Sequence, residues 1–194
     1  MQNVVFAGCG AVGSRMALES GRVGTSYLLI DDDRVDFMNV QTGSTIFWRQ
    51  HVGAFKTWAL SEMLARRFGA LAVADTETLT PARMRHYNYF AEARVVVDGF
   101  DNVEARRLTM QSGCPVLHVG VSASGTGVVA WDDKYELPDA APARGDNPVC
   151  THALGREIIT FTATVGAVFL ADWLYQGIKR PSVITTRDLS VIKF

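Results

Sequence analysis

The feature that most constrains this chain is an apolar run that leads directly into a glycine-rich turn. Residues 4–7 (VVFA) precede residues 8–13 (GCGAVG), and residues 14–18 continue with helical character. In such a strand–turn–helix, Gly8 allows the tight turn, Gly10 lets a phosphate approach the backbone, and Gly13 lets helix and strand pack closely. The helix N-terminus also presents free N–H groups to an anion. We therefore predict a nucleotide-binding βαβ unit, with a glycine-rich turn without ligand as the alternative.

Acidic residues follow the second predicted strand. That strand covers residues 26–30 and is followed by Asp31, Asp32 and Asp33. An acid about 20 residues after the glycines suits a ribose hydroxyl, and the carboxyl ends of strands in open α/β sheets are where ligands bind. A solvated loop is the alternative for a run of charges. We expect some of these acids, including Asp33, to take part in binding.

A second polar group follows a later strand. Residues 94–98 (RVVVD) are typical of a buried central strand of a parallel sheet. Asp101 and Asn102 come directly after it, at the edge predicted to bind the ligand. Asp101 is also a candidate N-cap for the helix that runs to residue 110, a role that does not exclude contact with a ligand.

Residues 53–68 predict an amphipathic helix with Lys56 in its first turn. Its apolar positions are Trp58, Leu60, Met63, Leu64 and Phe68. A cation in the first turn opposes the helix dipole. Lys56 is therefore either a functional residue or an exposed, solubilising lysine.

The remaining pattern continues the alternation of strands and helices. We predict strands at residues 71–74 and 115–119, a helix at 83–90, an antiparallel strand within 120–131, a helix at 156–176 and a terminal hairpin at 183–192. Residues 40–52 read as irregular, and residues 132–150 as a long polar loop. The alternation predicts a single domain over residues 1–194. Its α/β fold is Rossmann-like and doubly wound, with a mostly parallel sheet and antiparallel strands at the C-terminal side.

Composition narrows the class of protein. The 194 residues are 48% hydrophobic with a net charge of −1, which favours a globular protein over a general binder of nucleic acid or of membrane surfaces. Cys9, Cys114 and Cys150 form neither a disulfide framework nor a zinc half-site, so we expect a reducing, cytoplasmic setting. We expect no signal peptide. The apolar residues 158–174 include Asp172 and several threonines and predict a buried core helix rather than a membrane span.

Together these motifs resemble the ThiF/MoeB/HesA family, the nucleotide-binding core shared with ubiquitin-activating enzymes. The resemblance covers nearly the whole chain. Residues 8–13 resemble the family's glycine loop, residues 29–39 its acidic strand end, residues 53–56 its Gly-x-x-Lys, residues 97–106 its Asp-x-x-Asp-Asn…Arg motif, and residues 165–174 its late apolar helix. Cys150 lies just before that helix, where many members carry a reactive cysteine.

The resemblance implies an adenylyltransferase. Such an enzyme uses ATP to adenylate the C-terminal glycine carboxylate of a ubiquitin-like or sulfur-carrier protein and releases pyrophosphate. Gly8, Gly10 and Gly13 would then admit the phosphates, Asp31 would bind the ribose, Asn39 and Lys56 would contact phosphates, and Asp101 would coordinate Mg²⁺. The nucleotide-binding candidates also include Asp33 and Asn102, and the catalytic candidates are Cys150, Lys56 and Asp101. A homodimer is implied as well.

Three departures from the family pattern are visible. The family's Asn-x-x-Arg-Gln becomes residues 39–43 (NVQTG), so Thr42 replaces a phosphate-contacting arginine. We expect no counterpart of the helix that precedes the first strand in many members. The zinc-binding cysteine pairs are missing, and we expect no structural zinc. Losing cationic groups would slow phosphate chemistry, because electrostatic stabilisation carries most of it.

These departures leave three hypotheses. The first is an active adenylyltransferase. The second is a catalytically inactive relative that keeps the fold as a nucleotide-binding or scaffold protein, as Thr42 suggests. The third is a small NAD-dependent oxidoreductase, based only on the glycines and Asp31. Cys150 is either a nucleophile that forms a thioester or a persulfide-linked intermediate with the carrier, with His152 nearby to assist, or an unreactive loop thiol. We expect Cys9 and Cys114 to be packing residues and assign no function to His86 or His118.

Overall fold

The computed structural model describes residues 2–22, 24–86, 88–122, 124–137, 155–186 and 188–194. Its elements are, in chain order, β1 (Gln2–Ala7), α1 (Ala11–Glu19), β2 (Thr25–Ile30), α2 (Phe37–Gln41), the 3-10 helix η1 (Arg49–His51), α3 (Lys56–Phe68), β3 (Leu71–Asp75), α4 (Pro81–His86), α5 (Asn88–Glu92), β4 (Val95–Asp98), α6 (Val103–Met110), β5 (Val116–Val121), β6 (Gly127–Trp131), α7 (Gly155–Gln176), β7 (Val183–Thr185) and β8 (Val191–Lys193).

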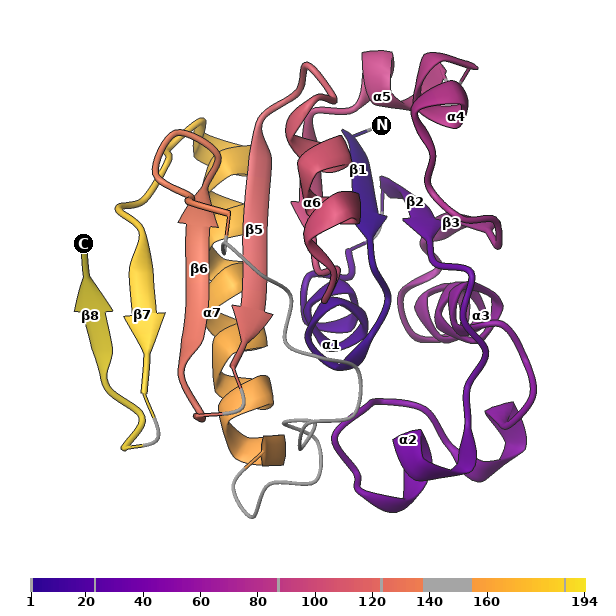
Figure 1. Cartoon of the computed structure of the whole chain (residues 1–194). Helices are drawn as coiled ribbons and strands as arrows, with labels where there is room; N and C mark the ends of the chain where they lie inside the picture. Colours follow the sequence, from indigo (N-terminus) through magenta and orange to yellow (C-terminus); the bar gives the residue numbers. More distant parts are fainter. Residues whose placement is uncertain (1, 23, 87, 123, 138–154, 187) are drawn as a thin grey trace.

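The strands form one mixed sheet in the order β3-β2-β1-β4-β5-β6-β7-β8. The strands from β3 to β5 in this order pair in parallel, and β6, β7 and β8 pair antiparallel. In the central register Ala7 lies opposite both Ile30 and Asp98. The chain segments that follow β1, β2 and β4 therefore leave the sheet side by side at one edge (Figure 1). This confirms the predicted α/β fold with its antiparallel C-terminal side.

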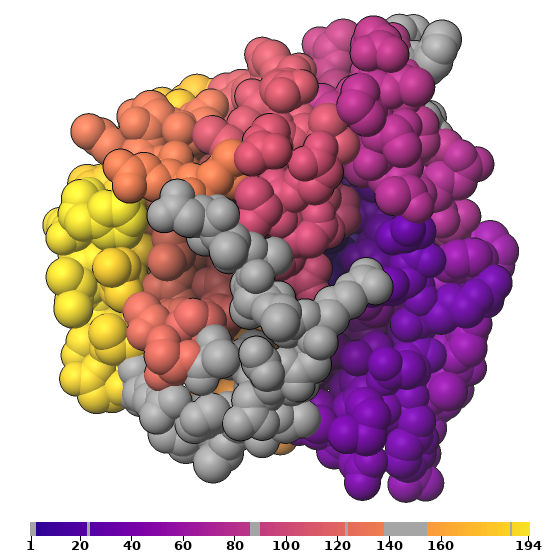
Figure 2. Space-filling view, in the orientation of Figure 1, coloured from indigo at the N-terminus to yellow at the C-terminus, as the bar shows by residue number. Residues whose placement is uncertain are grey.

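Helices cover both faces of the sheet, and each face has its own core. Along β1 the side chains alternate: Val4 and Phe6 belong to the core beneath α1, α3 and α7, while Val5 and Ala7 belong to the core beneath α6. This period-2 alternation is a property of strand geometry. Because both faces are covered, the central strands have to be apolar along their whole length. Figure 2 shows the C-terminal hairpin β7–β8 forming one side of the molecule and the N-terminal half the other.

Helix α7 has the composition of a membrane span and the packing of a core helix. Among the described residues it is the one helix long and apolar enough to cross a membrane. It runs along the sheet beside β5 and β6 and against α1. Ile159, Ala163 and Leu170 are fully buried in the main core. This packing confirms the predicted core helix.

Four local predictions differ from the structure. Residues 40–52, predicted to be irregular, include the end of α2 and η1, and the single helix predicted at 83–90 is two short helices, α4 and α5. Helix α3 begins at Lys56 rather than at Gly53. Trp58, predicted to be on the buried face of α3, is 55% exposed and makes an edge contact with Phe55. The buried face of α3 instead includes small residues such as Ala59, a pattern that hydrophobicity alone does not single out.

Candidate functional site

The glycine loop between β1 and α1 is closed by backbone packing. Gly8 has φ +91°, and a Cβ there would lie 2.6 Å from the backbone nitrogen of Phe100. A Cβ at Gly13 would lie 2.0 Å from the carbonyl oxygen of Gly8. At Gly10, by contrast, a Cβ would meet nothing within 4 Å. Gly8 and Gly13 therefore make the turn possible, and Gly10 leaves the outer surface of the loop open at the start of α1, where an anion is favoured.

Asp31 ties this loop to the end of β2. Its Oδ2 accepts a hydrogen bond from Cys9 N at 2.6 Å, and its Oδ1 accepts one from Asp33 N at 3.0 Å. Burial raises the pKa of Asp31, and the charge of Lys56 only partly offsets this effect. Both carboxylate oxygens keep a further lone pair for a hydroxyl. Asp31 thus also positions the glycine loop, a role that the sequence did not indicate.

Lys56 is a buried member of this cluster. The residue is 9% exposed, and its Nζ donates to Asp33 Oδ2 at 2.6 Å. Burial lowers the pKa of Lys56, but the charges of Asp31 and Asp33 outweigh burial, so that the net pKa is raised. The cation at the start of α3 is therefore held by neighbouring carboxylates. The exposed, solubilising lysine that the sequence allowed as an alternative is wrong.

Asp101 and Asn102, both candidates for nucleotide binding, differ in their structural roles. The N-cap of α6 is Asn102, whose Oδ1 accepts from Ala105 N at 2.7 Å, so the prediction of Asp101 as N-cap is wrong. Asp101 is exposed, and its charge contributes to the raised pKa of Lys56. Within the described part of the chain its carboxylate forms no ion pair. Its carboxylate supplies oxygen donors of the kind that Mg²⁺ prefers, so Asp101 fits the expected role as a ligand.

Asn39 and Thr42 belong to the short helix α2. Asn39 closes a capping box with Asp36: its backbone N donates to Asp36 Oδ1 at 2.7 Å, and its Oδ1 accepts from Asp36 N at 3.1 Å. Thr42 is the C-cap of α2, and its hydroxyl donates to the carbonyl of Met38 at 3.0 Å. Thr42 is thus engaged by its own helix and offers no positive charge where the family pattern has an arginine.

A buried polar group beside β4 was not predicted from the sequence. Asp98 and His118 are fully buried, and Asp98 Oδ2 lies 2.7 Å from His118 Nδ1 and 3.3 Å from Arg106 Nη1. Arg106 Nη2 also donates to Val119 O at 3.0 Å, and Tyr135 stacks on the His118 ring. These contacts fix the β4–α6 turn that carries Asp101. The available signals were Asp98 and Arg106 in the motif of residues 97–106 and one histidine in an otherwise apolar strand.

The three cysteines differ in whether the structure describes them. Cys150 and His152 lie outside the described residues. Cys9 is fully buried, and burial together with the charge of Asp31 raises the pKa of its thiol well above the ordinary value, so it packs as a neutral side chain. Cys114 packs against the core beneath α6. Both fit the predicted role of packing residues.

Comparison with protein families decides the relationship. The model of the ThiF family matches residues 1–189. The chain belongs to the ThiF family. Among curated proteins, none matches this sequence.

Several solved structures share the fold of this chain. E. coli MccB with ATP superposes with a TM-score of 0.75 at 14% identity, over 100% of this chain and 63% of MccB. E. coli MccB with MccA superposes with a TM-score of 0.75 at 15% identity, over 100% of this chain and 63% of MccB. PaaA superposes with a TM-score of 0.75 at 16% identity, over 100% of this chain and 64% of PaaA. The chain thus spans less than two thirds of the length of these proteins, and at these identities the likeness shows the fold.

Proposed function

We propose that this ThiF-family chain binds MgATP at the edge formed by β1, β2 and β4 and adenylates the carboxylate of a peptide or small protein. The observation that carries the proposal is the buried Lys56 ammonium, held by Asp33 beside the open glycine loop. A buried cation suits the higher negative charge of a triphosphate better than that of the NAD pyrophosphate. MccB, which shares the fold, has been solved with ATP and with MccA, and this supports the choice of ATP and of a peptide-like partner.

The chain's own residues would divide the work. The open start of α1 at Gly10 and the ammonium of Lys56 would neutralise phosphate charge, and Asp31 would hold the ribose. Lys56 is already desolvated, so it stabilises charge on a departing pyrophosphate without reorganising at the moment of reaction. Mg²⁺, bound by Asp101, would supply further charge neutralisation when present. The partner's carboxylate would attack the α-phosphorus from the exposed side of this edge.

For the partner we propose a ubiquitin-like or sulfur-carrier protein that ends in glycine, acted on by a cytoplasmic homodimer. The Cys150 thiolate would then attack the carbonyl carbon of the acyl adenylate, forming a thioester and releasing AMP. The carrier, the homodimer and the thioester derive from the family resemblance. The thioester is tested apart from adenylation, with Cys150→Ser.

The second candidate is a family member that binds nucleotide without activating a partner. Thr42 favours it, because its hydroxyl caps α2 and contributes no charge to the phosphates. The two candidates differ in turnover but not in ATP binding.

The decisive experiment measures binding and exchange in turn. MgATP should raise the melting temperature of the wild-type chain and NAD should not, since a ligand bound only to the native state stabilises it. Lys56→Gln should lose the MgATP shift. Greater stabilisation by NAD than by MgATP would overturn the proposal.

Exchange of labelled pyrophosphate into ATP is then measured with a carrier protein ending in Gly-Gly and with short peptides. The matched control is the same partner with an amidated C-terminus, which offers no carboxylate and should give no exchange. Exchange in the wild type rules out the inactive candidate. MgATP binding by the wild type without exchange, together with exchange gained in Thr42→Arg, would establish the inactive candidate. Cys150→Ser should keep exchange and lose the thioester.

A further inference from the structure

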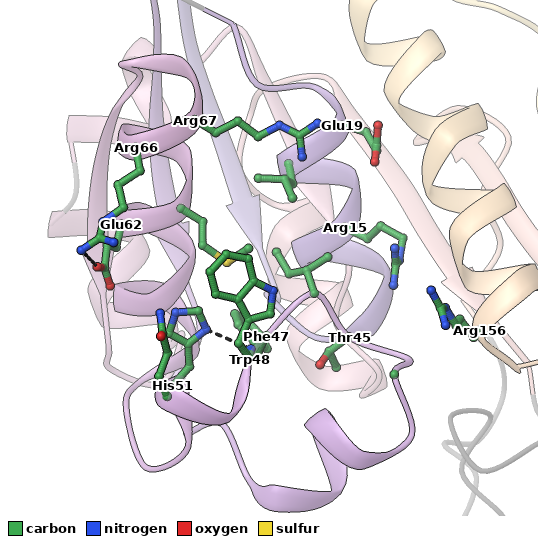
Figure 3. Close-up of a pocket in the computed structure, with 15 residues that line it drawn as sticks. Arg15, Glu19, Thr45, Phe47, Trp48, His51, Glu62, Arg66, Arg67 and Arg156 are labelled. Carbon is green, nitrogen blue, oxygen red and sulfur yellow. Dashed lines mark hydrogen bonds and ion pairs between the residues drawn. The ribbon is translucent and has the colours of Figure 1, made fainter.

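A second concave site lies away from the nucleotide edge. It is a cavity of about 530 Å³ lined by α1, the segment of residues 43–51, α3 and the first turn of α7 (Figure 3). None of its lining residues belongs to the glycine loop, the acidic run after β2 or the turn after β4. The volume is within the range of about 300–1,000 Å³ found for small-molecule sites.

Two arginines from distant parts of the chain face each other at one side of this cavity. Figure 3 shows the guanidinium groups of Arg15, on α1, and Arg156, on α7, directed toward one another. In the described part of the chain neither forms an ion pair. Arg15 makes a single long hydrogen bond, from Nη2 to Ser44 O at 3.5 Å, and its buried Nε has no partner among these residues.

Among the described residues, negative charge offsets the repulsion at Arg15 only in part. Burial lowers the pKa of Arg15, and the charge of Arg156 lowers it further, while Glu19 acts in the opposite direction. Elsewhere in the cavity Arg66 is paired with Glu62 at 2.7 Å. Two cations that the described residues compensate only in part are costly to hold together, because like charges at close range repel most where water is partly excluded.

The opposite wall is apolar and aromatic. Trp48 is 58% exposed, its ring stacks on His51 with centroids 5.7 Å apart, and its indole occupies the centre of the view in Figure 3. Phe47, Ile46 and Met63 complete this wall. A large aromatic side chain left in the open next to a cationic pair is suited to a planar ligand that carries a negative group.

We propose that this cavity binds a small organic anion, with its carboxylate or phosphate between Arg15 and Arg156 and its apolar body against Trp48. The paired guanidinium groups provide the forked donors that such oxyanions prefer. The site is separate from the nucleotide edge, so it binds its ligand whether or not the chain adenylates a partner.

Isothermal calorimetry with 1-naphthoate and phenyl phosphate tests the proposal, with 1-naphthamide as the uncharged analogue. The anions should bind and the amide should bind at least tenfold more weakly. Arg15→Gln and Arg156→Gln should each weaken anion binding by at least tenfold, which corresponds to about 1.4 kcal/mol. Arg107→Gln, which removes one positive charge on α6, should stay within twofold of the wild type. Trp48→Ala should weaken the binding of 1-naphthoate more than the binding of phenyl phosphate.

Two further measurements distinguish binding in this cavity from binding at the nucleotide edge and from a purely structural role of the arginines. Lys56→Gln should retain anion affinity; loss of binding in that variant would place the anions at the nucleotide edge and overturn the proposal. Without ligand, Arg156→Gln should melt at or above the wild-type temperature, because a like-charge contact is removed. Equal affinity of wild type, Arg15→Gln and Arg156→Gln, or no binding of either anion up to about 10 mM, would also overturn it.

Discussion

Replacing Lys56 by methionine keeps the length of a buried side chain and removes its charge. The hydrogen bond from Lys56 Nζ to Asp33 Oδ2, at 2.6 Å, is charge-assisted, a class worth about 1.5–3 kcal/mol. The Asp33 side chain is 69% exposed, so water screens the pair, and fully exposed pairs contribute only about 0–1 kcal/mol. We expect Lys56→Met to lose about 1–2 kcal/mol of unfolding free energy, between the ranges for these two cases. For a chain of this length that is a fall of roughly 2–8 °C in melting temperature.

The pH dependence of this loss follows from the directions of two pKa shifts. The pKa of Lys56 is raised, so its contribution is fully present below its ordinary value of 10.5 and is lost as pH rises through the raised value. The pKa of Asp31 is already raised by burial, and removing the nearby ammonium raises it further. Acidification then protonates Asp31 and removes the uncompensated negative charge. The deficit of Lys56→Met should therefore shrink as pH falls from 7 toward about 4.

Thermal and urea melts at several pH values measure this effect, with Lys134→Met as the control. Lys134 is exposed and forms no ion pair among the described residues. Its replacement should leave the melting temperature nearly unchanged. Two results would refute the reasoning. One is a Lys56→Met variant with the melting temperature of the wild type at pH 7, and the other is a stability deficit that is the same at pH 7 and at about pH 4.

Three further predictions concern the glycine loop, the buried polar group and α3. Gly13→Ala should lower the unfolding free energy in urea melts by more than about 2 kcal/mol, because its Cβ would lie 2.0 Å from Gly8 O. Gly10→Ala should fold normally, because its Cβ meets nothing within 4 Å, and should weaken MgATP binding in calorimetry. Asp98→Asn should lower the unfolding free energy by about 3–5 kcal/mol, since it leaves the buried Arg106 charge uncompensated. Glu104→Gln, which breaks an exposed ion pair, is the control, and equal melting temperatures of the two variants would contradict the prediction. Leu60→Ala should cost about 2–5 kcal/mol, and Trp58→Ala much less, because Leu60 is fully buried and Trp58 is exposed.

Much of the architecture could be predicted because it depends on neighbours in the chain. The spacing of Gly8, Gly10 and Gly13 determines the conformation of a single backbone turn. Apolar runs of strand length predict buried parallel strands. The carboxyl ends of parallel strands meet at one edge, so the predicted closeness of Asp31 and Asp101 to the glycine loop followed from topology alone. Boundaries were less accurate: α2, η1 and the break between α4 and α5 are short elements in which local signals are weak.

Side-chain environments depended on contacts between distant segments. Hydrophobicity placed Trp58 inside, but the orientation of α3 against the sheet turned it outward. The register between β4 and β5, not any local pattern, set Asp98 opposite His118.

The sequence by itself determined that this chain folds around a glycine loop with acids and a lysine at the same edge, because those signals are local or follow from strand direction. Only the tertiary structure decided that Lys56 is buried, that Asn102 rather than Asp101 caps α6, and that Arg15 meets Arg156. Burial, capping geometry and the approach of like charges are set by how whole elements pack. No spacing within one segment encodes the distance between two helices that lie at opposite ends of the chain.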